Sequence, residues 1–123
     1  MPLVVIRRKR KEFRKSRAIK LRDAIVGIVA KWLEVKPHEV EVRIRKFKKD
    51  DVNCPVLAVE IDTGSARNGW RLEQRERLSF LIQRDIKKTG IIPRRLLSRT
   101  GPYVWMRVVG SSFVPIGFPK AKR

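Results

Sequence analysis

The sequence predicts one α/β (α+β) domain at residues 1–118, with a duplicated β-α-β unit, a four-stranded mixed sheet and two helices on one face. The observation behind this prediction is that residues 2–47 and 55–109 repeat one order of segments. Each half has an apolar strand opened by proline, a polar turn, an amphipathic helix, a proline-containing loop and an alternating strand. A helix between two strands is the connection that parallel pairing requires. The 123 residues fit a single domain, and residues 119–123 are expected to form a frayed basic tail.

The first half begins with a continuous apolar run at residues 3–6, which is typical of a strand buried in a sheet. A helix follows that ends near Leu33, and Ser16 is its expected N-cap, with a start one turn earlier as the alternative. The apolar residues of this helix recur at steps of three and four, so they form one buried face. They are Ala18, Leu21, Ile25, Ile28 and Trp32. Residues 40–44 then alternate apolar and charged side chains, which predicts a strand covered on one face.

The second half follows the same plan. Residues 55–61 predict a strand, residues 70–88 a helix that Gly90 is placed to end, and residues 103–108 the last strand of the sheet. Residues 113–118 predict a short additional strand able to reach a neighbouring subunit.

With both helices on one face, the other face of the sheet carries aromatic side chains and the apolar residues of the central strands. Exposed apolar area of this kind usually marks an interface. We therefore predict a homo-oligomer that packs through the sheet. The charged positions of this face are expected to line an internal channel, or to pair as Glu41 with an arginine.

Charge is the second prominent feature, because 31 Lys and Arg against 12 Asp and Glu give a net charge of +19. Basic residues are densest at residues 7–17. Cations at the start of a helix oppose its macrodipole, so local stability does not explain them and an anionic partner is expected. Nucleic acid, an acidic membrane surface and a multiply charged small substrate are the candidates. The alternative is a basic surface that only keeps the protein soluble.

Several classes of function are excluded or disfavoured by the composition. No apolar run approaches the roughly 20 residues that span a bilayer, so no membrane segment is expected and a cytoplasmic location is predicted. Cys54 is the only cysteine and His38 the only histidine, so we expect no disulfide, no metal site and no Ser-His-Asp or Cys-His arrangement. No phosphate-binding or dinucleotide-binding glycine motif occurs, and no cofactor is predicted.

Three features together carry a resemblance to a known family. Pro2 directly follows the initiator methionine and heads a strand, the β-α-β unit is duplicated, and residues 35–40 read Val-Lys-Pro-x-x-Val at the entry to the second strand. In these features the chain resembles the tautomerase superfamily. Its length is closest to long-subunit members such as carboxymethyl-hydroxymuconate isomerase and macrophage migration inhibitory factor.

The resemblance implies a homotrimer with active sites at subunit boundaries, and a reaction that moves a proton between enol and keto forms of a small 2-oxo or enol carboxylate. It also implies that Met1 is removed and that the secondary amine of Pro2 becomes the catalytic base. An α-amino group has an unperturbed pKa of about 7.7–8.0, and a base near neutrality suits this proton transfer. Lys36 matches a pocket lysine, which would hold the substrate carboxylate and favour the neutral Pro2 amine.

Further substrate contacts follow from the same resemblance. Arg8 and Arg10, after the first strand, would supply positive charge. At the start of the second strand, Glu41 stands where oxalocrotonate tautomerase has an arginine, and Arg43 on the same face is the candidate substitute. The turn after the third strand would border the pocket and contribute Thr63 and Asn68.

Two other functions stay open. The first is a nucleic-acid-binding module, which rests on the overall charge, on Arg94, Arg95 and Arg99, and on aromatic residues able to stack on bases. The aromatic residues are Trp70, Tyr103 and Trp105. The second is a catalytically silent oligomeric scaffold on the same fold, because a fold does not determine a function.

Overall fold

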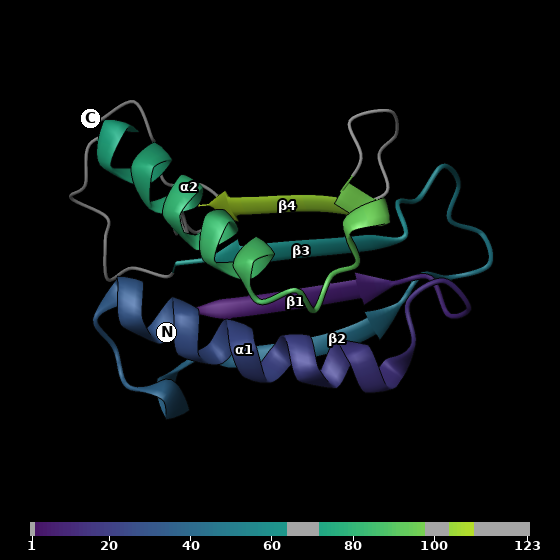
Figure 1. The fold of residues 1–123 in the computed structure, drawn as a ribbon, viewed down its shortest axis with the longest axis horizontal. Helices are drawn as coiled ribbons and strands as arrows, with labels where there is room; N and C mark the ends of the chain where they lie inside the picture. Colours follow the sequence, from purple (N-terminus) through teal and green to yellow (C-terminus); the bar gives the residue numbers. More distant parts are fainter. Residues whose placement is uncertain (1, 64–71, 98–103, 110–123) are drawn as a thin grey trace, which may run out of the picture.

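The computed structural model describes residues 2–63, 72–97 and 104–109 (Figure 1). Its strands are β1 (Leu3–Arg8), β2 (Glu41–Lys46), β3 (Leu57–Asp62) and β4 (Val104–Val109). Its helices are α1 (Lys15–Leu33) and α2 (Leu72–Lys88), and two short 3-10 turns are η1 (Pro37–Glu39) and η3 (Arg94–Leu97). Neither helix is long and apolar enough, over the described residues, to cross a bilayer.

The four strands form one mixed sheet in the order β2-β1-β3-β4. β1 is parallel to β2 and β3 is parallel to β4, while the central pair β1 and β3 is antiparallel. Each β-α-β half therefore supplies two parallel strands, and α1 and α2 lie on the same face of the sheet (Figure 1). This confirms the predicted fold class.

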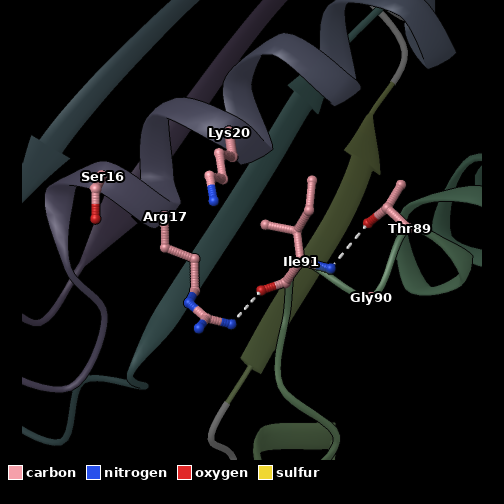
Figure 2. A pocket seen from close by; sticks show the side chains of 6 residues that line it. All are labelled: Ser16, Arg17, Lys20, Thr89, Gly90 and Ile91. Carbon is pink, nitrogen blue, oxygen red and sulfur yellow. Dashed lines mark hydrogen bonds between the residues drawn. The ribbon is translucent and has the colours of Figure 1, made fainter.

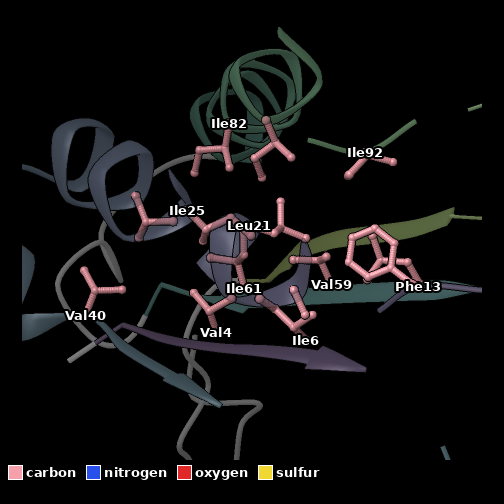
Figure 3. Close-up of a cluster of buried hydrophobic side chains, with 14 of the residues drawn as sticks. Val4, Ile6, Phe13, Leu21, Ile25, Val40, Val59, Ile61, Ile82 and Ile92 are labelled. Atoms are coloured by element: carbon pink, nitrogen blue, oxygen red, sulfur yellow. The ribbon is translucent and has the colours of Figure 1, made fainter. Parts of the chain in front are cut away.

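The core lies between the sheet and the two helices (Figure 3). Every second side chain of β1 points toward the helices and is buried there, because successive side chains of a strand point to opposite faces of the sheet. The labelled core side chains come from both layers: Val4, Ile6, Val59 and Ile61 from β1 and β3, Leu21 and Ile25 from α1, Ile82 from α2, and Phe13, Val40 and Ile92 from the connections. Each of them is less than 9% exposed.

The start of α1 differs from the prediction. The helix begins at Lys15, its N-cap is Arg14, and no side chain caps it, so the assignment of Ser16 as N-cap was wrong. Phe13 is buried and its N–H donates to the carbonyl of Lys9 (3.0 Å). This buried aromatic anchors the chain just before the helix, so the helix starts upstream of the serine. The first turn of α1 contains no acidic residue.

Strand boundaries also shift. β1 continues through Arg7 to Arg8, two residues into the segment that the sequence suggested was a turn, and β2 extends to Lys46. The start of the predicted helix at residue 70 and the predicted strand at residues 113–118 lie outside the described residues.

One polar contact joins the two helices. The indole N–H of Trp32 in α1 donates to Oδ2 of Asp85 in α2 over 2.7 Å. This hydrogen bond, followed by the neighbouring Arg84 and Lys31 cations, lowers the pKa of the Asp85 carboxyl against an opposing effect of desolvation. The ionised carboxylate is therefore the form that holds α1 to α2.

We expect Asp85→Asn to lower the free energy of unfolding by about 1 kcal/mol at pH 7, because a charge-assisted hydrogen bond is weakened. A carboxyl whose pKa is lowered on folding stabilises the fold above its unfolded pKa of about 3.9 and loses that effect as pH falls through the folded value. The difference between the two proteins should therefore shrink between pH 5 and pH 2, roughly.

Urea unfolding at both ends of that pH range measures the effect. Asp23→Asn is the matched control, because Asp23 also pairs with the arginine before it but is 67% exposed. Exposed pairs contribute about 0–1 kcal/mol, so this control should change little. A pH-independent difference for Asp85→Asn would contradict the assignment.

Candidate active site

Pro2 directly precedes β1, at the end of the sheet where β1 and β2 begin and β3 ends. We call this end of the sheet the Pro2 edge. Pro2 is buried, and its carbonyl accepts a hydrogen bond from the N–H of Glu41 (3.0 Å), the first residue of β2. On the other side, Leu3 is paired with Asp62, so the antiparallel register brings Thr63 to the level of Pro2. Pro2 thus lies between the start of β2 and the end of β3.

The surroundings of Pro2 are largely apolar. Strand alternation puts it on the helix-covered side with Val4, and its neighbour across β2 is Val40, which is 8% exposed. Thr63 is 3% exposed, and its N–H donates to the carbonyl of Val109 at the end of β4 (3.0 Å). The start of β2 and the end of β3 therefore flank the proline, and the end of β4 lies beyond Thr63.

Lys36 stands on the connection that leads into this edge. It is the residue before η1, and its backbone N–H donates to Oε1 of Glu39 over 2.9 Å. Its side chain is exposed. The 3-10 turn fixes the backbone of Lys36 shortly before Glu41, whose N–H bonds Pro2.

Arg43 lies on the open face of the sheet, the face without helices, beside Val5. Its guanidinium contacts Oε2 of Glu41 over 2.7 Å, and both side chains are half exposed. The pairing of Glu41 with an arginine is thus found within one chain. Arg43 consequently has a carboxylate partner already, which a substrate carboxylate would have to displace.

Arg8 and Arg10 lie at the opposite end of β1 from Pro2. Arg8 is six residue steps along the strand from Pro2, which corresponds to roughly 20 Å. Arg8 is only 6% exposed, because its side chain lies on the same helix-covered face of β1 as Val4 and Ile6. Its Nη1 donates to the carbonyl of Phe13 (3.0 Å), and its buried Nε has no hydrogen-bond partner. Arg8 thus supports the β1–α1 turn, while Arg10 is exposed.

The structure therefore gathers only part of the predicted site in one chain. Pro2, Lys36 and Thr63 belong to one edge of the sheet, Arg43 lies further along β2, and Asn68 is outside the described residues.

Sequence reasoning missed one feature of this edge. Leu3 is flanked on the open face by two carboxylates, Glu41 on β2 and Asp62 on β3. Only the strand register reveals this pair, because 21 positions separate the two residues in the chain. Over residues 2–63, 72–97 and 104–109, no group of three or more metal-binding side chains is assembled.

Comparison with known proteins places this geometry on a known fold. No protein-family profile matches the sequence, and no curated protein matches it significantly. Solved structures do match. A member of the cis-3-chloroacrylic acid dehalogenase family has a TM-score of 0.62 at 13% identity, covering 89% of this chain and 74% of its own. A malonate semialdehyde decarboxylase inhibited by 3-bromopropiolate has a TM-score of 0.59 at 14% identity, covering 98% and 92%.

A fused 4-OT, solved as a symmetric trimer, also has a TM-score of 0.59, at 13% identity, covering 96% of this chain and 92% of its own. These neighbours are members of the tautomerase superfamily. The chain has their fold. This confirms the resemblance as one of fold, since the identities are low.

We expect Arg8→Ala to lower the free energy of unfolding by about 2 kcal/mol, because it removes a buried side chain and leaves the Phe13 carbonyl without its donor. Arg10→Ala, two residues away on the exposed turn, is the matched control and should change stability by about 0.5 kcal/mol or less. Urea unfolding monitored by tryptophan fluorescence compares them. Equal stability of the two variants would show that the Arg8 contact does not stabilise the fold.

Proposed function

We propose that the protein is a keto-enol tautomerase in which the amine of Pro2, freed by removal of Met1, is the catalytic base. The observation that carries the proposal is the position of Pro2, which is buried before β1 between the start of β2 and the end of β3, on a fold shared with tautomerase superfamily structures. A secondary amine takes a proton from the enol hydroxyl of the substrate, and its ammonium form returns a proton to the adjacent carbon.

The surroundings of Pro2 suit this role. Val40 and the neighbouring apolar core disfavour the charged form of a buried amine, so a larger share of it is available as base at neutral pH. Positioned acid–base groups of this kind typically contribute 10²–10⁴-fold to a rate. Thr63, two strands from Val40, is proposed as a substrate contact.

Recognition of the substrate carboxylate falls to cations. Lys36, on the connection that leads to this edge, is the proposed carboxylate partner, and Asn68 is proposed as a further contact. Because Arg8 and Arg10 lie roughly 20 Å from Pro2 in the same chain, they would act on the site of a neighbouring subunit. Arg10 is the better placed of the two, since Arg8 is buried and already bonded to Phe13.

A trimer supplies that neighbour. The fused 4-OT neighbour is a symmetric trimer, and the open sheet face of this chain has an apolar centre with charged surroundings. Leu3 and Val5 are half-buried on this face, and Trp105 is 45% exposed. Arg107 lies over the Trp105 ring and pairs with Glu60 (2.9 Å). Burial of this face between subunits would also protect the charged pairs from water.

The proposed substrate is a small 2-oxo or enol carboxylate. Inhibition of the malonate semialdehyde decarboxylase neighbour by 3-bromopropiolate supports this class, because the inhibitor is itself a small carboxylate. A cytoplasmic location, where such acids are metabolised, is part of the proposal.

We expect purified protein to ketonise hydroxyphenylpyruvate, and Pro2→Ala to reduce kcat/KM by about 100-fold or more, since the secondary amine is lost. The measurement is loss of enol absorbance, on protein whose N-terminus has been determined by mass spectrometry. Pro37→Ala is the matched control, because Pro37 opens η1 and has no free amine. Full activity of Pro2→Ala, or of protein that retains Met1, would exclude Pro2 as the base.

We expect light scattering to give three times the mass of one chain, and Val5→Asp to reduce this mass, because a charge is placed in the centre of the open face. Val52→Asp is the matched control, since Val52 is 79% exposed on the β2–β3 connection. Circular dichroism verifies that both variants are folded. A monomeric parent protein, or a trimeric Val5→Asp variant, would contradict assembly through the sheet.

A further inference from the structure

A hollow of about 280 Å³ lies between the start of α1 and the segment that follows α2 (Figure 2). Ser16, Arg17 and Lys20 line it from α1, and Thr89, Gly90 and Ile91 line it from the other side. Arg17 Nη1 donates to the carbonyl of Ile91 (3.0 Å), which fixes the two walls relative to each other. A direct hydrogen bond therefore holds together the two segments that form the hollow, although they are 74 residues apart in the chain.

A second hollow, of about 600 Å³, adjoins the first, because Gly90 lines both. Gly90 has a φ of 73°, in the left-handed region that favours glycine, and it turns the chain sharply after α2. Three exposed cations line this hollow, namely Lys87, Lys88 and Arg94. Arg84, Ile92 and Leu97 complete its walls.

No carboxylate lines either hollow among the described residues. The ion pairs of the described residues involve Arg22, Arg43, Arg84 and Arg107, so five cations here have no carboxylate partner in that part of the chain. They are Arg17, Lys20, Lys87, Lys88 and Arg94. The adjacent hollow between α1 and α2 differs, since Asp23 and Asp85 line it. Five cations without a carboxylate partner are thus brought together around the two hollows that meet at Gly90.

An exposed aromatic side chain extends this surface along α2. A third hollow, of about 430 Å³, shares Arg84 and Lys87 with the second and is lined by Phe80 and, at its far end on α2, by one carboxylate, Glu76. Phe80 is 57% exposed, although the opposite side of α2 buries Leu78 and Ile82. We call the three connected hollows the Gly90 groove.

We propose that the Gly90 groove binds single-stranded nucleic acid. Phosphates would follow the five unpaired cations, and a base would stack on Phe80. A positively charged groove with an exposed aromatic ring is the combination that single strands require, because phosphates are evenly spaced and every base has a face that can stack. A duplex keeps its bases stacked on one another, so it could not use Phe80.

The groove is distinct from the proposed catalytic edge. It lies on the helix layer, where α1 begins, and α1 begins just after the end of β1 that is opposite Pro2 (Figure 1). None of the residues proposed for tautomerase chemistry lines it. Binding there can therefore succeed or fail independently of catalysis.

The test compares two triple variants with the same net charge. Lys20→Gln/Lys87→Gln/Arg94→Gln removes three groove cations, and Lys46→Gln/Lys48→Gln/Lys49→Gln removes three exposed cations at the end of β2 and on the β2–β3 connection, none of which lines the groove. Fluorescence anisotropy measures Kd for a labelled 12-residue oligothymidylate and the matching oligouridylate at several salt concentrations. Arg17 is left intact because it bonds Ile91.

We expect the groove variant to bind both oligonucleotides about tenfold or more weakly, and its slope of log affinity against log salt to decrease by about 2, at roughly 0.7 per lost phosphate contact. The control triple should stay within about threefold of the parent. Equal weakening by both triples would overturn the proposal, because the charge would then act without a defined site.

Phe80→Ala tests the stacking contact separately. It should weaken single-strand binding about tenfold without changing the salt slope, since no charge is lost. Tighter binding of a 12-base-pair duplex than of the single strand, or unchanged affinity of Phe80→Ala, would overturn the single-strand assignment. The groove variant should retain the ketonisation activity of its parent, so a failure of this proposal is distinguishable from a failure of the tautomerase proposal.

Discussion

The position of β1 at the centre of the sheet is the constraint on which the rest of this structure depends. β1 is parallel to β2 on one side and antiparallel to β3 on the other, so its register fixes both neighbours. Because side chains alternate along a strand, the same register sends Val4, Ile6 and Arg8 under the helices and leaves Leu3 and Val5 on the open face. A slip of one residue would exchange these sets. Pro2, directly before β1, is buried for the same reason.

The duplicated pattern was sufficient to predict the fold, because the period of apolar residues in each segment is local information. The apolar face of α1 with Leu21 and Ile25 and the apolar strand around Val4 both belong to the core.

Side-chain roles that depend on long-range pairing were not predictable. Arg8 stands in a run of basic residues that suggested a turn, yet register and parity bury it. The edge at Pro2 was located by a resemblance, whereas the pair of carboxylates beside Leu3 emerges only from strand order. The Gly90 groove joins segments distant in the chain, and no local pattern indicates it.

Charge is unevenly distributed along the strand direction, and this matters for any chemistry at Pro2. Glu39, Glu41 and Asp62 lie near the edge where β1 begins, whereas the basic run from Arg7 onwards lies where it ends. A single chain therefore presents mixed charge around Pro2. Within one chain only Lys36 is proposed to bind the substrate carboxylate, and further cations would come from the far end of another copy. The case for catalysis and the case for an oligomer are therefore linked by electrostatics as well as by fold.

The same distribution separates the two proposed activities. At physiological ionic strength charges are screened beyond about 8 Å, and the start of α1 lies at the end of β1 that is roughly 20 Å from Pro2. Cations in the Gly90 groove consequently add little to the electrostatic field at Pro2 within the same chain.

A small substrate with one or two carboxylates requires far less than a net charge of +19. Solubility alone would be served by charges spread evenly over the surface, but five unpaired cations gather around hollows that also lead to an exposed Phe80. A polyanion with stacking bases accounts for both the cations and the aromatic ring, and neither a carboxylate substrate nor solubility does.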